Sequence, residues 1–86
     1  MEDQNSMGGH KTRDGVRLAT ILRVATLAGA GWKEGRNHPY LLTYEGLRPC
    51  PIAASTDARR MVAPWLAQAT GRDRQETYDC LRNGSW

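Results

Sequence analysis

Apolar residues recur between positions 18 and 28 with the spacing of one helical face. They are Leu18, Ile21, Leu22, Ala25 and Ala28. Side chains three or four residues apart lie on the same side of an α-helix. The pattern therefore predicts a first helix that begins near Asp14, with Thr12 or Asp14 as its N-cap, and that ends at Gly29 or Gly31.

In the segment HPYLLTYEG, residues 38–46, the pattern instead repeats every two residues, as it does in a strand. Successive side chains of a strand point to opposite faces of the sheet. One face would then carry Tyr40, Leu42 and Tyr44, and the other Leu41 and Thr43.

Glu45-Gly46 is typical of a tight turn, which predicts a returning strand over residues 47–53. This strand contains Pro49 and Pro51, which have no amide hydrogen to donate, so we expect it at the edge of the sheet. A short strand at residues 33–36 would complete a three-stranded antiparallel meander.

A second helical pattern follows Ser55 or Thr56, either of which can serve as its N-cap. Its apolar stripe consists of Ala58, Val62, Trp65, Leu66 and Ala69. Pro64 falls inside the pattern, and a proline in mid-helix costs about 3 kcal/mol, so we expect a kink or a break near Ala63.

Asp73 and Glu76 have the spacing of a capping box, which predicts a last helix over residues 73–82. The economical packing of these elements puts the helices on one face of a small antiparallel sheet. We therefore predict an α+β fold, a small α-β-β-β-α sandwich with an extra C-terminal helix. Residues 1–13 are polar, so we expect a disordered tail followed by a single domain over residues 14–86.

The composition excludes several classes of protein. The chain has 86 residues and no run of about 18 apolar residues, so no segment is expected to enter a membrane. Its first residues are polar and include acids, unlike a secretory signal, which favours a cytoplasmic location. Cys50 and Cys80 are expected to be reduced thiols. With His10 and His38 they show no metal-ligand spacing, so we predict no metal and no cofactor.

The net charge of +3 is unevenly distributed. Residues 11–60 hold nine of the basic residues, seven of them arginines, against four acids. Arginine binds phosphate through two parallel hydrogen bonds, so this excess suits a nucleic acid. An ordinary solvated basic surface explains the charge equally well.

His38 is the candidate for general acid/base catalysis, because histidine titrates near neutral pH without perturbation. The sequence has no phosphate-binding loop and no catalytic triad pattern. RNA cleavage requires a base for the 2′-hydroxyl group and cations for the charge that develops on the phosphate. His38 could supply the base, and Lys33, Arg36 and Arg48 the cations. The alternative is that His38 is a polar loop residue without a catalytic role.

Four stretches, taken in order, resemble the HicA toxin family over residues 16–70. They are ILRVATLAGAGW, NHPYLLTY, RPCPIAAST and DARRMVAPWLAQA. The matching elements are Gly31-Trp32 after the first helix, Asn37-His38 with Tyr40 at the start of a strand, and Asp57 with Arg59 at a later helix.

The resemblance implies a fold like that of double-stranded-RNA-binding domains. It also implies a small ribonuclease toxin that cleaves mRNA without metal, with His38 as its catalytic residue and a cognate antitoxin protein that covers it. We expect Lys33, Arg36, Arg48 and Arg59 to bind RNA.

A second class of function fits the same scaffold. The last helix carries Tyr78 and Leu81, which are suited to docking a protein partner or a second subunit. The chain would then be a non-catalytic regulator or inhibitor that binds a protein or nucleic acid, or a homodimer stabilised by association.

The aromatic residues give a further expectation about the core. Trp32 and Trp65 end apolar stripes and are expected inside it. Tyr40 and Tyr44 lie in the core if Leu42 faces inward, and on an outer, base-stacking face if Leu41 does.

Overall fold

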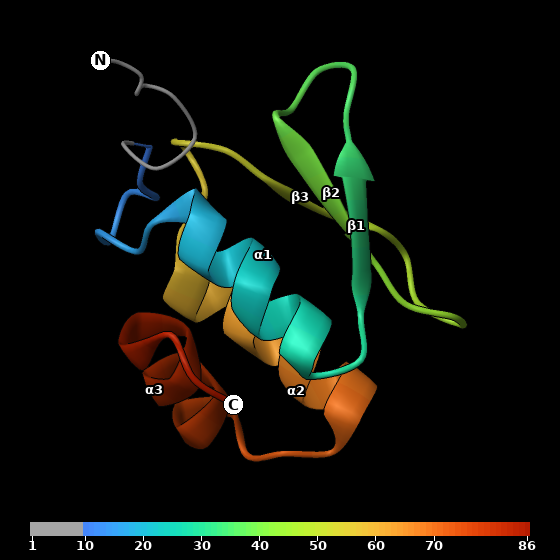
Figure 1. The fold of residues 1–86 in the computed structure, drawn as a ribbon, viewed down its shortest axis with the longest axis vertical. Helices are drawn as coiled ribbons and strands as arrows, with labels where there is room; N and C mark the ends of the chain where they lie inside the picture. The colour runs from blue at the N-terminus through green and yellow to red at the C-terminus, as the bar shows by residue number, and fades with distance from the viewer. Residues whose placement is uncertain (1–9) are drawn as a thin grey trace.

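The computed structural model describes residues 10–86, and Figure 1 shows the helices on one side of the sheet. The elements in chain order are α1 (Leu18–Leu27), β1 (Gly31–Glu34), β2 (Tyr40–Thr43), β3 (Cys50–Ile52), the π-helical turn η3 (Ala58–Val62), α2 (Ala63–Thr70) and α3 (Arg74–Asn83). The predicted α-β-β-β-α order with an added C-terminal helix is confirmed. Within residues 10–86 no helix combines the length and the apolar character needed to cross a membrane.

The sheet is an antiparallel meander in the order β1-β2-β3. Trp32 pairs with Leu42, and Leu42 pairs with Cys50 on its other side. β3, which contains Pro51, lies at an edge, as the prolines predicted. β1 is the other edge strand, and it begins two residues earlier than predicted, at Gly31.

The first helix begins at Leu18, and the predicted start near Asp14 is wrong. Residues 12–16 form a turn in which the Thr12 hydroxyl donates to Asp14 and accepts from the amide of Val16. Gly15 has a φ of 87° in this turn, a conformation that glycine adopts without strain. The helix ends at Leu27, and Gly29, with a φ of 100°, turns the chain into β1.

Residues 1–9 of the expected tail lie outside the described residues. Residues 10–13 are part of the hydrogen-bonded fold. The Arg13 amide donates to the Thr56 carbonyl at 2.8 Å, and the carbonyl of His10 accepts from the amide of Leu18 at 2.9 Å.

The second helical segment changes its hydrogen-bonding pattern at Ala63, next to Pro64, and its backbone stays helical there. η3 ends at Val62, and α2 begins at Ala63 with Pro64 in its first turn, where its missing amide hydrogen is not needed. The N-cap is Asp57, whose side chain accepts from the Arg60 amide, and not Ser55 or Thr56. The Thr56 hydroxyl accepts from the amide of Ala53 instead, closing the turn after β3.

The last helix follows its prediction closely. The Asp73 carboxylate accepts from the amides of Gln75 and Glu76 at 2.9 and 3.2 Å. Gly84, with a φ of 76°, ends the helix. α3 packs on α2, η3 and α1. Tyr78 and Leu81 are buried in this packing, so the expectation that they dock a partner is wrong.

The core lies between the sheet and the helices. Its largest fully buried side chains include Leu18, Ile21, Leu42, Ile52, Leu66 and Leu81. Because Leu42 faces inward, Tyr40 and Tyr44 pack against the core, and the outer-face alternative is wrong. Trp65 also packs there, but Trp32 is 42% exposed, so its predicted burial is wrong. β1 is an edge strand, so only one neighbouring strand covers Trp32, which makes an edge-to-face contact with Tyr40.

Candidate functional site

The candidate catalytic residue, His38, lies in the hairpin loop, residues 35–39, between β1 and β2. Figure 1 shows this loop at the top of the molecule, at the end of the sheet farthest from α3. The side chains of His38 and Arg36 are exposed. The loop therefore presents an imidazole and a guanidinium group to solvent.

Gly35 allows the hairpin loop to close tightly. Its amide donates to the Pro39 carbonyl at 3.3 Å. A Cβ atom at this position would lie 2.6 Å from the backbone oxygen of His38, closer than a real side chain permits. The position of His38 therefore depends on a glycine three residues before it.

Lys33 belongs to the same hairpin. It lies on β1 opposite Leu41, two residues before the loop, and its side chain is exposed. The structure thus places three of the predicted site residues on one hairpin: Lys33, Arg36 and His38. A general base with adjacent cations is the combination that metal-independent cleavage of a phosphodiester requires.

Arg48 is not part of this group, so the expectation that it acts beside His38 is wrong. His38 comes just before β2 and Arg48 follows it, so they lie at opposite ends of that strand. The carbonyl of Arg48 accepts a hydrogen bond from the Trp65 indole at 2.7 Å.

Arg59 belongs to a different cluster as well. Its guanidinium group donates to the Gln75 side chain at 3.0 Å and lies 4.9 Å from the centroid of the Tyr78 ring. Both partners are on α3, which Figure 1 shows at the end of the molecule opposite the hairpin loop. Arg59 can therefore contact RNA only at a surface separate from His38.

Arg59 lines a hollow of about 490 Å³ between η3 and α3. Its lining residues are Arg59, Arg60, Pro64, Arg74, Gln75 and Tyr78. Sequence reasoning missed Arg74 and Arg82 as candidates. The available signal was the four-residue spacing of Arg74, Tyr78 and Arg82 on a helix whose existence the capping box predicted.

Asp14 organises the edge of this hollow. Its carboxylate accepts from the amides of Ala58 and Arg59 at 2.9 and 3.0 Å and from the Tyr78 hydroxyl at 3.3 Å. Burial by itself would raise the pKa of Asp14, but the hydrogen bonds from Thr12 and the two amides outweigh it and lower the pKa to about 2. The group is therefore a fixed anion that caps η3 and is not an acid/base catalyst at neutral pH.

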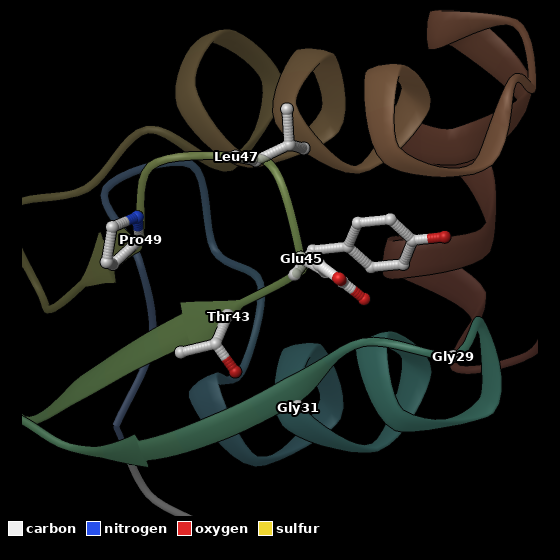
Figure 2. Close-up of a pocket in the computed structure, with 7 residues that line it drawn as sticks. Gly29, Gly31, Thr43, Glu45, Leu47 and Pro49 are labelled. Atoms are coloured by element: carbon white, nitrogen blue, oxygen red, sulfur yellow. The ribbon is translucent and has the colours of Figure 1, made fainter.

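A larger hollow, of about 690 Å³, lies elsewhere, between the turn after α1 and the β2–β3 loop. Figure 2 shows Glu45, Leu47 and Pro49 from the loop on one side and Gly29 and Gly31 on the other. Thr43 and Tyr44 complete its lining. None of these residues is a cation, so this hollow is unsuited to a phosphate group.

The remaining candidates for chemistry are the cysteines and the acids of residues 10–86. Burial raises the pKa of the Cys50 thiol to about 11, so it is protonated and unreactive at neutral pH. Within residues 10–86, no three histidine, cysteine or acidic side chains are grouped closely enough to hold a metal ion.

Comparison of the whole chain with models of known protein families, with curated proteins and with solved structures finds no match.

Proposed function

We propose that this chain is a HicA-like RNA-binding toxin that cleaves mRNA without metal, with His38 as general acid/base. The observation that carries the proposal is the hairpin, on which His38, Arg36 and Lys33 are all exposed. The α-β-β-β-α order of elements also supports it, since that is the order the resemblance implies.

The reaction would proceed by internal transfer in the RNA. The His38 imidazole takes the proton of a 2′-hydroxyl group, and the 2′-oxygen forms a bond to the adjacent phosphorus as the bond to the 5′-oxygen breaks. Water or the imidazolium ion supplies a proton to the leaving oxygen. Arg36 and Lys33 would stabilise the charge on the phosphate oxygens, where arginine can donate two parallel hydrogen bonds.

The proposal includes a location and partners. RNA is the substrate, the cytoplasm is the compartment, and a cognate antitoxin protein would bind over the hairpin loop and hide His38. No cofactor is required, because the base and the cations come from the chain itself.

The test is RNA cleavage in EDTA by the wild type and by His38→Ala, with His10→Ala as the matched control. His10 is also exposed and lies outside the hairpin. We expect His38→Ala to cleave 10²–10⁴-fold more slowly, as is typical on removal of a general base, and His10→Ala to match the wild type. Equal rates for the wild type and His38→Ala would refute the catalytic role.

A non-catalytic regulator that binds a protein partner is the second candidate. It is favoured by an apolar hollow of about 350 Å³ between α1 and β1, where Leu27 and Trp32 are 58% and 42% exposed. Exposed aromatic and aliphatic side chains at a concave site are typical of protein interfaces. No cleavage by the wild type, together with RNA binding that is insensitive to salt or absent, would favour this candidate.

A further inference from the structure

A band of arginine and lysine side chains follows the added helix α3, away from the hairpin loop. Arg74, Tyr78 and Arg82 are four residues apart and therefore lie on one side of α3. The hollow at Arg74 and Tyr78 also contains Arg59 and Arg60 from η3.

A second hollow, of about 300 Å³, continues the band. It is lined by Lys11, Arg17 and Arg82 together with Gly15, Val16, Thr20 and Leu81. Arg82 links the two hollows, because its guanidinium carbon is 5.9 Å from the centroid of the Tyr78 ring in the first. We call this surface the α3 basic face; its cations are Lys11, Arg17, Arg59, Arg60, Arg74 and Arg82.

Three acids that cap the helix starts beside this face are engaged by other groups. Both oxygens of Asp14 accept hydrogen bonds from backbone amides and hydroxyl groups. The carboxylate of Asp57 accepts from the Arg60 amide, and that of Asp73 accepts from the amides of Gln75 and Glu76. These acids cap helices, and the caps leave the guanidinium groups of the face able to bind an external anion.

The cations are spread along the face and do not converge on one point. Arg74 and Arg82 are about 12 Å apart along the axis of α3, from the helical rise per residue. A single phosphate group is much shorter than this distance, so the two arginines would bind different phosphates. A series of arginines at this spacing fits a chain of phosphates better than a single small anion.

Arg59 is held in place before any ligand binds. The Gln75 side chain accepts its hydrogen bond, and the Tyr78 ring lies 4.9 Å beneath its guanidinium carbon. Ordering this side chain in the free protein reduces the entropy that binding would otherwise cost.

We propose that the α3 basic face binds the phosphodiester backbone of RNA. This inference rests on the proposed function for the identity of the ligand, but it does not depend on the chemistry of His38. The added helix would then be a binding element, and the hairpin loop the place of cleavage.

The test is the salt dependence of RNA binding, measured by fluorescence anisotropy in EDTA. The probe is a labelled single-stranded 2′-O-methyl RNA of mixed sequence, which cannot be cleaved because it has no free 2′-hydroxyl group. The double variant Arg74→Gln/Arg82→Gln should bind on the order of 10-fold more weakly at 0.1 M salt. Its slope of log affinity against log salt should be smaller by about 1.4, at about 0.7 for each phosphate contact.

Two variants serve as controls for charge and folding. Arg23→Gln removes one exposed cation of α1 that lines neither hollow of the face and lies outside the hairpin loop, and it should leave the slope unchanged. Arg74→Lys/Arg82→Lys keeps the charges and should retain the wild-type slope. Circular dichroism then shows that each variant has the wild-type helix content.

The outcomes separate this inference from the proposed function. An unchanged slope in the folded double glutamine variant overturns the inference, whether or not the wild type cleaves RNA. A reduced slope with no RNA cleavage by the wild type supports the inference and refutes the role of His38. Binding of a polyglutamate peptide that depends on Arg74 and Arg82, without any binding of RNA, overturns the inference in favour of an acidic protein partner.

Discussion

Replacing Asp14 by alanine tests whether one carboxylate holds the N-terminal turn, η3 and α3 together. Its Oδ1 accepts from the Thr12 hydroxyl at 2.6 Å and from the Ala58 amide at 2.9 Å. Its Oδ2 accepts from the Arg59 amide and the Tyr78 hydroxyl. Ala58 is fully buried, so its amide depends on this carboxylate for a hydrogen-bond partner.

The expected loss follows from these contacts. Removing a helix-capping side chain costs 0.5–2 kcal/mol, typically about 1, and leaving a buried donor unpaired costs about 1–3 kcal/mol. These two costs overlap, so we expect Asp14→Ala to lower the free energy of unfolding by about 2 kcal/mol. For a domain of this size that loss corresponds to a fall in Tm of roughly 10 °C. Asp14→Asn keeps one acceptor oxygen and should lose about half as much.

The pH dependence of this loss gives an independent check. The pKa of Asp14 is lowered from 3.8 to about 2 in the folded protein. A lowered carboxyl pKa stabilises the fold above the unfolded value, and that stabilisation disappears as the pH falls from about 4 through about 2. The difference between the two pKa values corresponds to roughly 2 kcal/mol, which solvent screening reduces to about 1 kcal/mol because Asp14 is only partly buried.

The assay is urea unfolding followed by circular dichroism at pH 7, 4 and 2.5, for the wild type and Asp14→Ala. Asp79→Ala is the matched control, because Asp79 is an exposed acid of α3 that accepts from the Gln75 side chain. The difference in the free energy of unfolding between the wild type and Asp14→Ala should be largest at pH 7 and smaller at pH 2.5. A loss below 0.5 kcal/mol at pH 7, or a loss that does not change with pH, would refute the reasoning.

Three further predictions concern other parts of the fold. Cys50 is buried with a pKa of about 11, so a thiol reagent at pH 8 should modify the half-buried Cys80 first and reach Cys50 only after denaturant is added. Gly84→Ala should lower the free energy of unfolding by about 1–2 kcal/mol in urea titrations, because φ is 76° and the new Cβ would lie 2.7 Å from the Arg23 guanidinium. Leu42→Ala should cost 2–5 kcal/mol by the same measurement, because it leaves a cavity at a fully buried position of the central strand.

Local sequence signals predicted the elements well where their physical cause is local. The three- and four-residue spacing in α1, the alternation in β2 and the capping box before α3 involve only neighbouring residues. Pro64 also acts locally, since it has no amide hydrogen to donate and therefore favours the first turn of a helix. These features could therefore be predicted from the sequence alone.

The errors arise where a residue's partner is distant in the sequence. Asp14 has the chemistry of an N-cap, but it caps a helix whose first residue, Ala58, is 44 positions later. Trp32 has the chemistry of a core residue, but its strand lies at the edge of the sheet. No rule based on neighbouring residues distinguishes these outcomes, because they depend on how the elements pack.

The candidate site residues also differ in how well the sequence predicts where they lie. Lys33, Arg36 and His38 are close in sequence and remain together on one hairpin. Charge links Arg48 to this group and the family resemblance links Arg59 to it, but the strand direction and the helix packing place both residues elsewhere. The spacing of Arg74 and Arg82 could be read from the sequence, but their proximity to η3 could not.

Asp14 also bears on the function, because the same carboxylate borders the α3 basic face. By accepting from the Arg59 amide and the Tyr78 hydroxyl, it fixes η3 against α3 and so sets where the guanidinium groups of the face lie. An ionised acid beside arginines would ordinarily compete with a phosphate for them. Here the acid's oxygens are already occupied by amides and hydroxyl groups, so it positions the arginines while leaving them available to bind an external anion.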